Sequence, residues 1–142
     1  MVDLVITAAN VIPGTEAEGA QFEYGTAGAT ITPGQAVYLE ASTNTYKLAD
    51  NNDTSEALSV VRGISLHAAT ANQPLKIQTR GPITIGATVA SGSVYVLSAT
   101  AGAIAPVADL ATGNRCTLIM VGMNGSTTRA NLQPYSSKAV RP

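Results

Sequence analysis

A stretch of fifteen residues occurs twice in this chain, and the repetition limits the folds that the chain can adopt. GATITPGQAVYLEAS begins at Gly28, and GATVASGSVYVLSAT begins at Gly86, 58 residues later. Seven positions correspond, and they include the pair Gly34 and Gly92. A solenoid needs three or more repeats, so a repeat that is present twice indicates two related modules instead. We expect them to pack as a sandwich or to form one small pseudo-symmetric barrel.

The similarity extends beyond these stretches and gives approximate bounds for the two repeats. VVRGIS at 60–65 corresponds to IMVGMN at 119–124, so that Gly63 falls on Gly122. We therefore divide the chain into an N-terminal arm or first strand, 1–24, and a β domain, 25–142, whose two internal repeats span about 28–80 and 86–134.

Short runs of alternating or β-branched residues predict an all-β fold, β-barrel, β-tulip-like or sandwich in form. The 13 glycines and 7 prolines interrupt nearly every stretch, and the alanines show no sustained helical period. LKIQTR at 75–80 alternates, so that Lys76, Gln78 and Arg80 are expected on its polar face. The other expected strands are 4–7, 22–24, 36–40, 45–48, 60–66, 82–85, 93–97, 103–107, 115–123 and 128–133.

Turn residues separate these strands. Asn124-Gly125 lies between the last two expected strands, and this pair is a strong hairpin signal because both residues accept positive φ. In TPGQ, Pro33 presets φ for a type II turn, in which Gly34 takes the left-handed conformation. ASGS keeps the glycine, Gly92, without the proline. We predict that the two glycines occupy equivalent turns for this backbone reason.

Charged residues are distributed unevenly along the chain. Residues 1–60 contain eight of the nine acidic residues and one of the eight basic residues, and 61–142 contain the others. In one interpretation, strands from both parts interleave and give a surface of mixed sign. In the other, two patches of opposite sign favour head-to-tail contact between copies and closure into a ring.

Few residues are suited to catalysis, metal binding or nucleic-acid recognition. The single cysteine, Cys116, is expected to be a small buried hydrophobe, and the single histidine, His67, is expected in a solvated loop. DNNDTSE at 50–56 offers oxygen ligands for calcium but lacks the frame of an EF-hand loop. The pI near 5.7 and the absence of tryptophan argue against nucleic-acid binding. We predict no enzymatic activity, no cofactor and no metal.

Ten segments form the basis of a family resemblance: DLVITAANVIPG, GATI, GQAVYL, KLAD, VRGI, QTRG, ITIGATV, VYVLSATAGAIAP, ADLATG and VGM. In this order they resemble the small decoration or cement proteins of tailed-phage capsids. The resemblance implies a β-barrel or β-tulip-like body on the outside of an icosahedral head. It also implies binding to the major capsid protein where capsomers meet, often as a trimer. EAEGAQFEY at 16–24 and the basic end SSKAVRP have no counterpart that we can place in that family.

The first functional hypothesis is therefore a structural virion protein that binds an assembled phage capsid and stabilises it by bridging neighbouring capsomers. It would be made in the host cytoplasm and have no membrane partner, because the chain shows no signal peptide and no apolar run of about 20 residues. The alternative is a β-rich carbohydrate-binding or head-fibre module of a virion, which would expose aromatic rings. A hydrolase with an unrecognised site is a third hypothesis.

The N-terminal segment is the candidate partner-binding site. Its apolar residues Leu4, Ile6, Val11 and Ile12 have strand spacing but no partner that the repeat scheme requires, and Asp3 lies beside them. Such an arm would add a strand to a neighbour or lie across a capsid seam, where main-chain hydrogen bonds supply affinity. The other interpretation is an ordinary first strand of the barrel.

Overall fold

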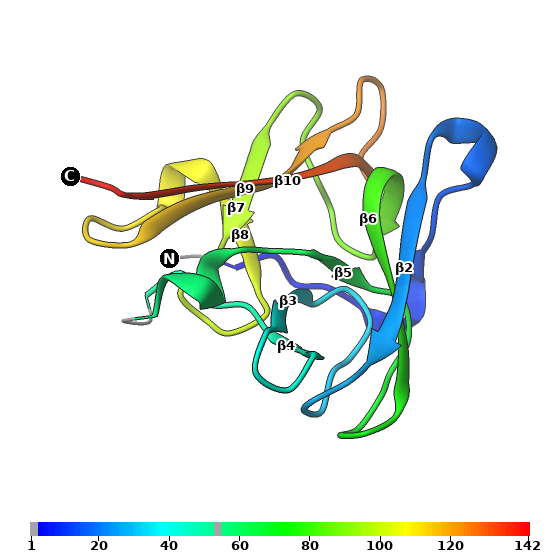
Figure 1. Ribbon diagram of the computed structural model, residues 1–142. Coiled ribbons are helices and arrows are strands. Elements are labelled where there is room, and N and C mark those ends of the chain that lie inside the picture. Colours follow the sequence, from blue (N-terminus) through cyan, green and yellow to red (C-terminus); the bar gives the residue numbers. More distant parts are fainter. Residues whose placement is uncertain (1–2, 53–54) are drawn as a thin grey trace.

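The computed structural model describes residues 3–52 and 55–142, and it confirms the all-β prediction (Figure 1). Strands make up 45% of the chain and form a ten-stranded antiparallel sheet that curls into a half-barrel. The strands are β1 (Val11–Ile12), β2 (Gln21–Thr26), β3 (Ala36–Glu40), β4 (Thr45–Leu48), β5 (Gly63–Ser65), β6 (Pro74–Ile85), β7 (Val94–Leu97), β8 (Ile104–Pro106), β9 (Arg115–Gly122) and β10 (Arg129–Val140).

Short 3-10 helices connect some of these strands. They are η1 (Ala8–Asn10), η2 (Glu16–Glu18), η3 (Glu56–Ser59) and η4 (Val107–Asp109). Within the described part of the chain, none of the helices has the length and apolar character that crossing a bilayer requires. The expected strand at 4–7 is not a regular strand, although two of its backbone amides are hydrogen-bonded to the rest of the molecule.

The long strand β6 joins the two halves of the sheet. Its first part, 74–80, pairs with β2 on one edge and contacts β5 on the other. Its second part, 81–85, pairs with β10 and with β1. The order along the sheet is β4-β3-β5-β6-β10-β9-β7-β8, and Figure 1 shows β6 turning between its two sets of neighbours.

Two groups of five strands in this sheet have the same order. The first unit is β4-β3-β5-β6-β2, and the second unit is β8-β7-β9-β10-β6. The second part of β6 therefore has the place in the second unit that β2 has in the first. Tyr24 of β2 lies opposite Lys76, and Pro82 of β6, 58 residues after Tyr24, lies opposite Asn131. The repeat thus begins with β2, several residues earlier than the sequence similarity indicated.

The turn glycines have matching hydrogen bonds in the two units. The N–H of Gly34 donates to the carbonyl of Ser65 at 2.9 Å, and the N–H of Gly92 donates to that of Gly122 at 2.9 Å. The residue after each glycine accepts the N–H of Ser65 or Gly122 in return, at 3.0 and 2.9 Å. Gly34 and Gly92 have φ values of 88° and 76°. Ser65, rather than Gly63, is therefore the structural counterpart of Gly122, and the sequence alignment was wrong by two residues here.

The hairpin between β9 and β10 contains Asn124-Gly125, but it is longer than a two-residue turn. Gly125 has a φ of 74°, whereas Asn124 does not have positive φ. The Ser126 hydroxyl accepts the N–H groups of Thr128 and Arg129 at 3.3 and 3.0 Å. A serine side chain therefore completes this turn, where the sequence pattern predicted two residues of positive φ.

Apolar side chains from both units form the main core. It contains Ala36, Tyr38, Ala49, Val61, Ile64, Ile83, Ile85, Val89, Tyr95, Leu97, Ile104, Ile119, Met120, Ala130 and Leu132. A smaller cluster lies within the first unit: Ala27, Ile31, Val37, Tyr46, Ala69, Leu75 and Ile77. Because the main core draws on both units, neither unit encloses it alone.

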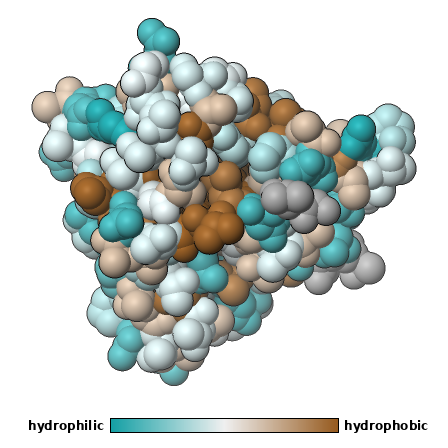
Figure 2. Space-filling model, turned by 180° about the vertical axis from the view of Figure 1, so that it is seen from behind, coloured by the Kyte–Doolittle hydropathy of each residue, from teal (hydrophilic) through white to brown (hydrophobic). Residues whose placement is uncertain are grey.

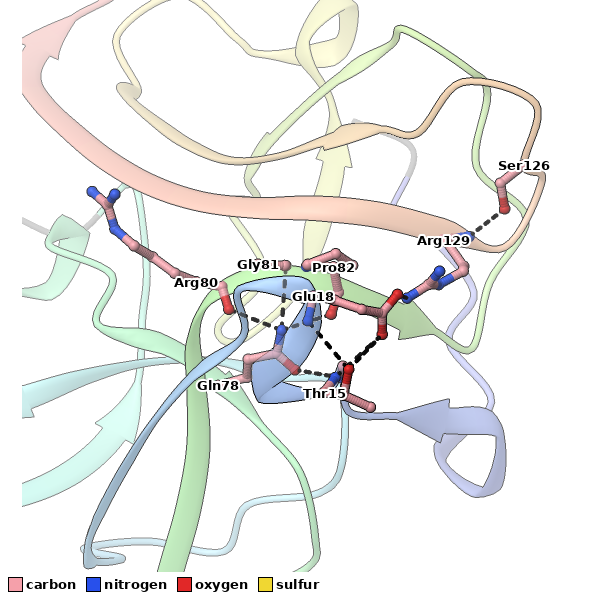
Figure 3. A network of polar contacts seen from close by, with 9 residues as sticks. Thr15, Glu18, Gln78, Arg80, Gly81, Pro82, Ser126 and Arg129 are labelled. Carbon is pink, nitrogen blue, oxygen red and sulfur yellow. Dashed lines mark hydrogen bonds and ion pairs between the residues drawn. The ribbon is translucent and has the colours of Figure 1, made fainter.

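Gln78 of β6 is a polar residue that is fully buried, although it belongs to the polar face of the strand. Its Oε1 accepts the N–H of Gly14 at 3.0 Å. Its Nε2 lies 3.0, 3.2 and 2.8 Å from the carbonyl oxygens of Arg80, Gly81 and Pro82 (Figure 3). The side chain thereby holds the bend of β6, because it bonds to the backbone on the far side of that bend.

The covering segment, residues 14–20, shields Gln78 from solvent. Thr15 and Glu18 form a capping box at η2, with the Glu18 N–H 3.3 Å from the Thr15 hydroxyl. The Glu18 carboxylate then accepts from Arg129 of β10 at 2.8 Å (Figure 3). This ion pair ties the covering segment to the second unit.

Candidate functional site

The N-terminal segment is bound along the molecule by backbone hydrogen bonds to the second unit and to the connection that follows β6. The N–H of Leu4 donates to the carbonyl of Ile104, and the N–H of Thr7 donates to that of Gly86, both at 2.8 Å. β1 then pairs with the end of β6, where Ile12 lies opposite Thr84. Residues 3–12 therefore form part of the folded body.

The side chains of this segment also have partners within the chain. Leu4, Ile6 and Val11 are half-buried against the main core, and the Asp3 carboxylate accepts a hydrogen bond from the Ser98 hydroxyl. A Cβ at Gly34 would lie 2.6 Å from Ile6 Cγ2, so the turn glycine makes room for this packing. The premise that these residues lack a partner in their own molecule was wrong. The half-barrel leaves apolar core atoms uncovered, and the segment covers them.

Two other side chains of the segment point outward. Val5 is 87% exposed and Ile12 is 57% exposed. Both line a shallow groove of about 440 Å³, whose other lining residues are Thr7, Asn10, Thr84, Gly86, Ala87, Thr88 and Thr128. Sequence reasoning included Ile12 but missed Val5. The signal was present, because Val5 lies between Leu4 and Ile6, and a strand that buries one face exposes the other.

A second groove, of about 240 Å³, lies on the other side of the segment. It is lined by Leu4, Ile6, Ala8, Thr32, Pro33, Gly34, Gln35, Thr100, Ala101, Gly102 and Ala103. The segment therefore separates two partly apolar depressions. Figure 2 shows the molecule from behind, where apolar atoms gather near the centre of the face and polar atoms surround them. We call the N-terminal surface the area formed by Val5, Ile12 and the first groove.

Neither the single histidine, His67, nor the single cysteine, Cys116, lines the N-terminal surface. His67 lies in the exposed loop before β6, where its Nε2 accepts the N–H of Lys76 at 3.0 Å. Its Nδ1 lies 3.0 Å from the carbonyl oxygen of Ala68 and donates to it, because Nε2 carries the lone pair. Cys116 lies on the expected strand, β9, but it is half-buried, whereas the sequence predicted a buried residue. The His67 ring thus serves as a link between two backbone segments.

The calcium candidate at 50–56 is a turn in its described part. The Asp50 carboxylate accepts the N–H of Asn52 at 3.0 Å, and Asp53 and Thr54 lie outside the described residues. Among the residues that the structure describes, no three His, Cys, Asp or Glu side chains are grouped to hold a metal ion.

Ion pairs connect the acidic and the basic parts of the chain. Four pairs are present among the described residues: Glu40 with Lys47, Glu23 with Arg62, Glu18 with Arg129, and Glu56 with Lys138, at 3.0, 2.9, 2.8 and 3.5 Å. All four acids come from 1–60, and three of the four bases come from 61–142. The pairs therefore support the interpretation of a mixed surface over that of two opposite patches.

Glu23 of β2 accepts a hydrogen bond from the hydroxyl of Tyr46, a residue of β4. Burial acts to raise the pKa of Glu23, but hydrogen bonds from Tyr46 and Arg62 outweigh it and hold the pKa below its usual range. Burial, together with the hydrogen bond to Glu23, raises the pKa of the Tyr46 phenol well above its usual range. The folded protein therefore favours an ionised Glu23 and a neutral Tyr46.

We expect stability to fall at both ends of the pH scale. The Glu23 contribution is present above the unfolded pKa of about 4.3 and is lost as pH falls further, because the folded pKa is lower. The Tyr46 contribution is present below the unfolded pKa of about 10 and is lost as pH rises through the folded pKa. Melting temperatures between pH 3 and 11 test this. Tyr46→Phe should flatten the alkaline limb and Tyr135→Phe, at an exposed ring, should not; an unchanged limb in Tyr46→Phe would contradict the assignment.

The candidate site is thus a surface, in which a firmly bound segment presents two apolar side chains beside a groove. None of the described residues that form the N-terminal surface is charged, and the carboxylate of Asp3, which precedes it in the segment, is bonded to Ser98. No model of a known protein family matches this chain, and no curated protein matches it either.

Proposed function

We propose that this chain is a structural virion protein that binds the outside of an assembled phage capsid and stabilises it by bridging neighbouring capsomers. The observation that carries the proposal is the exposure of Val5 and Ile12 on a segment that is otherwise bound to the core. Large apolar side chains held in solvent beside a groove are typical of an interaction surface. The order of the sequence segments that resemble decoration proteins supports the same function.

The proposed stabilisation follows from mass action. A protein that binds the assembled shell and not its free subunits favours the shell by the binding free energy at each site. The effect is multiplied because a shell offers many equivalent sites. A binding segment already held by its own molecule loses little conformational freedom on binding, which preserves affinity. In this proposal Asp3, Leu4, Ile6 and Val11 hold the segment in place, and Val5 and Ile12 contact the major capsid protein.

The proposal includes self-association on the capsid exterior, with a trimer favoured by the family resemblance. Three ion pairs join the acidic part of the chain to its basic part, so contacts between copies would depend on local polar groups at the rim of each interface. The protein would be made in the host cytoplasm.

A double substitution tests capsid binding. We expect Val5→Asp with Ile12→Asp to weaken binding to expanded shells of the encoding phage by roughly 100-fold. Each side chain contributes about 1.5 kcal/mol when it is buried, and 1.4 kcal/mol corresponds to a factor of ten. Co-sedimentation with shells that lack the protein measures binding, and the temperature of shell disruption measures stabilisation.

The matched control is Val107→Asp with Val140→Asp, which introduces the same two charges at exposed valines of η4 and β10. This variant should bind shells as the wild type does, and all variants should keep the wild-type melting temperature. A wild-type protein that does not sediment with shells would contradict the proposed function. Full binding by the double variant would contradict the assignment of the N-terminal surface.

A further inference from the structure

A second surface, distinct from the N-terminal surface, lies on the first unit. Phe22 and Tyr24 project from β2, and Lys76 of β6 lies opposite Tyr24. The Lys76 ammonium lies 4.4 Å from the centre of the Phe22 ring and 5.4 Å from that of Tyr24. Tyr24 is 73% exposed. We call these three residues the aromatic–lysine face.

The counterpart of this face in the second unit is covered by an acidic segment of the same chain. Pro82, which has the position of Tyr24, is buried, and a Cβ at Gly14 would lie 2.0 Å from its carbonyl oxygen. Gly14 begins the covering segment, whose Glu18 pairs with Arg129 at 2.8 Å (Figure 3). In the second unit, the acidic covering segment, folded around the 3-10 helix η2, therefore lies where the first unit exposes an aromatic ring.

The edge of β2 is also open where its counterpart is paired. Thr84 of β6 lies opposite Arg129 on one edge and opposite Ile12 of β1 on the other. Thr26, the counterpart of Thr84, lies opposite Pro74 on one edge, and β2 pairs with β6 alone among the described strands. The chain is bridged to Tyr46 of β4 only from Ala27 onward, so the unpaired edge is that of 21–26. An edge strand of this kind can accept a further strand through its free main-chain groups.

We propose that the aromatic–lysine face binds an extended acidic peptide segment of a partner protein, which adds along the free edge of β2. The Lys76 side chain extends from β6 over the rings of Phe22 and Tyr24, so its ammonium group lies above β2. Arg80, at the other end of the β2 pairing, is exposed, and Figure 3 shows its side chain extending away from the Gln78 amide. Arg80 thus adds a second, exposed cation on β6.

The chemistry of the face selects carboxylates over a sugar. The ammonium lies over both rings, so a sugar that stacked there would have to displace it. A carboxylate could instead pair with the ammonium while the apolar atoms of the peptide pack on Tyr24. Glu16 lines the hollow of about 520 Å³ beside the rings, so the acidic groups of the peptide belong on the Lys76 side.

The test uses an alternating peptide, acetyl-Thr-Glu-Val-Glu-Val-Glu-Thr-amide, which places all its carboxylates on one face of a strand. In titrations followed by amide NMR spectra, we expect shifts confined to β2, β6 and the covering segment. Lys76→Gln should weaken binding at least tenfold, and Lys138→Gln, at an exposed lysine of β10, should leave it unchanged. The same peptide with Gln for Glu should also bind at least tenfold more weakly.

A second variant guards against misfolding. Tyr24→Ser changes an exposed side chain and should weaken binding of the peptide. The amide signals of residues away from position 24 should keep their wild-type chemical shifts, which shows that the variant is folded. Equal binding of the glutamine peptide, or shifts elsewhere on the molecule, would overturn the proposal. So would competition by neutral oligosaccharides, or shifts at β2 that depend on protein concentration alone and so indicate a second copy. Because the shells contact the N-terminal surface, the proposed function can fail or hold independently of these results.

Discussion

Gly122→Ala is expected to destabilise the fold by about 3 kcal/mol, the upper part of the range for overpacking. The added Cβ would lie 1.9 Å from the carbonyl oxygen of Ala90. The backbone cannot easily move away, because Gly122 accepts from Gly92 and donates to Ser93, both at 2.9 Å. Relief of the clash would therefore break hydrogen bonds that join the β6–β7 connection to β9. Urea denaturation followed by circular dichroism measures the loss.

Gly92→Ala is the matched control in the same turn. Its φ of 76° disfavours any side chain, but no atom lies within 4 Å of the added Cβ. The cost should be about 1 kcal/mol, which is the conformational term alone. An equal loss in the two variants would show that the close approach of Ala90 does not limit stability.

Gln78→Leu is the second large effect that we expect, again about 3 kcal/mol. The variant leaves the buried N–H of Gly14 without an acceptor and removes the donor shared by three carbonyl groups at the bend of β6. An unsatisfied buried polar group costs about 1–3 kcal/mol, and several groups are affected here. The covering segment should also loosen, which amide hydrogen exchange at 14–20 would report.

Gln73→Leu separates the role of burial from that of the amide group. Gln73 accepts the N–H of Thr70 at 2.8 Å through its side chain, but it is exposed, so water can replace the bond. We expect a loss below about 1 kcal/mol for this variant. A loss for Gln78→Leu as small as that for Gln73→Leu would contradict the view that the buried amide organises the bend.

The strands were largely predictable, because alternation and turn residues are local properties of the chain. The expected strands 36–40 and 45–48 match β3 and β4. Gln78 was not predictable in this way. Alternation placed it on the polar face correctly, but only the tertiary position of 14–20 decides that this part of the face is covered.

The details of the repeat were less accessible from sequence than its existence. Gly63 and Gly122 align in the sequence comparison, but the hydrogen bonds show that Ser65 is the structural counterpart of Gly122. The two units differ in what lies against the carbonyl group of the turn residue two positions before the turn glycine. In the first, the Ser65 hydroxyl donates to the carbonyl of Thr32 at 2.5 Å, whereas in the second the equivalent carbonyl approaches the glycine directly. A difference of this kind is invisible to alignment.

The candidate site was predictable in place but not in detail. The sequence indicated the N-terminal segment, and the structure shows that its inward side chains anchor it while Val5 and Ile12 face outward. Which residues point inward depends on the core that the two units leave open, and this core forms from residues far apart in the chain.

The sharing of β6 has a consequence for how such a chain can grow. Each unit has five strands, yet nine strands, β2 to β10, suffice for two units, because the closing strand of the first also opens the second. The last part of β10 corresponds to the last part of β6, which is the part shared with the second unit. This part of β10 follows the residues that pair with β6. A third unit could therefore use the last part of β10 as its first strand, and it would need only four additional strands. Conversely, a cut within β6 would leave each fragment without a complete set of five strands, so we expect neither unit to fold alone.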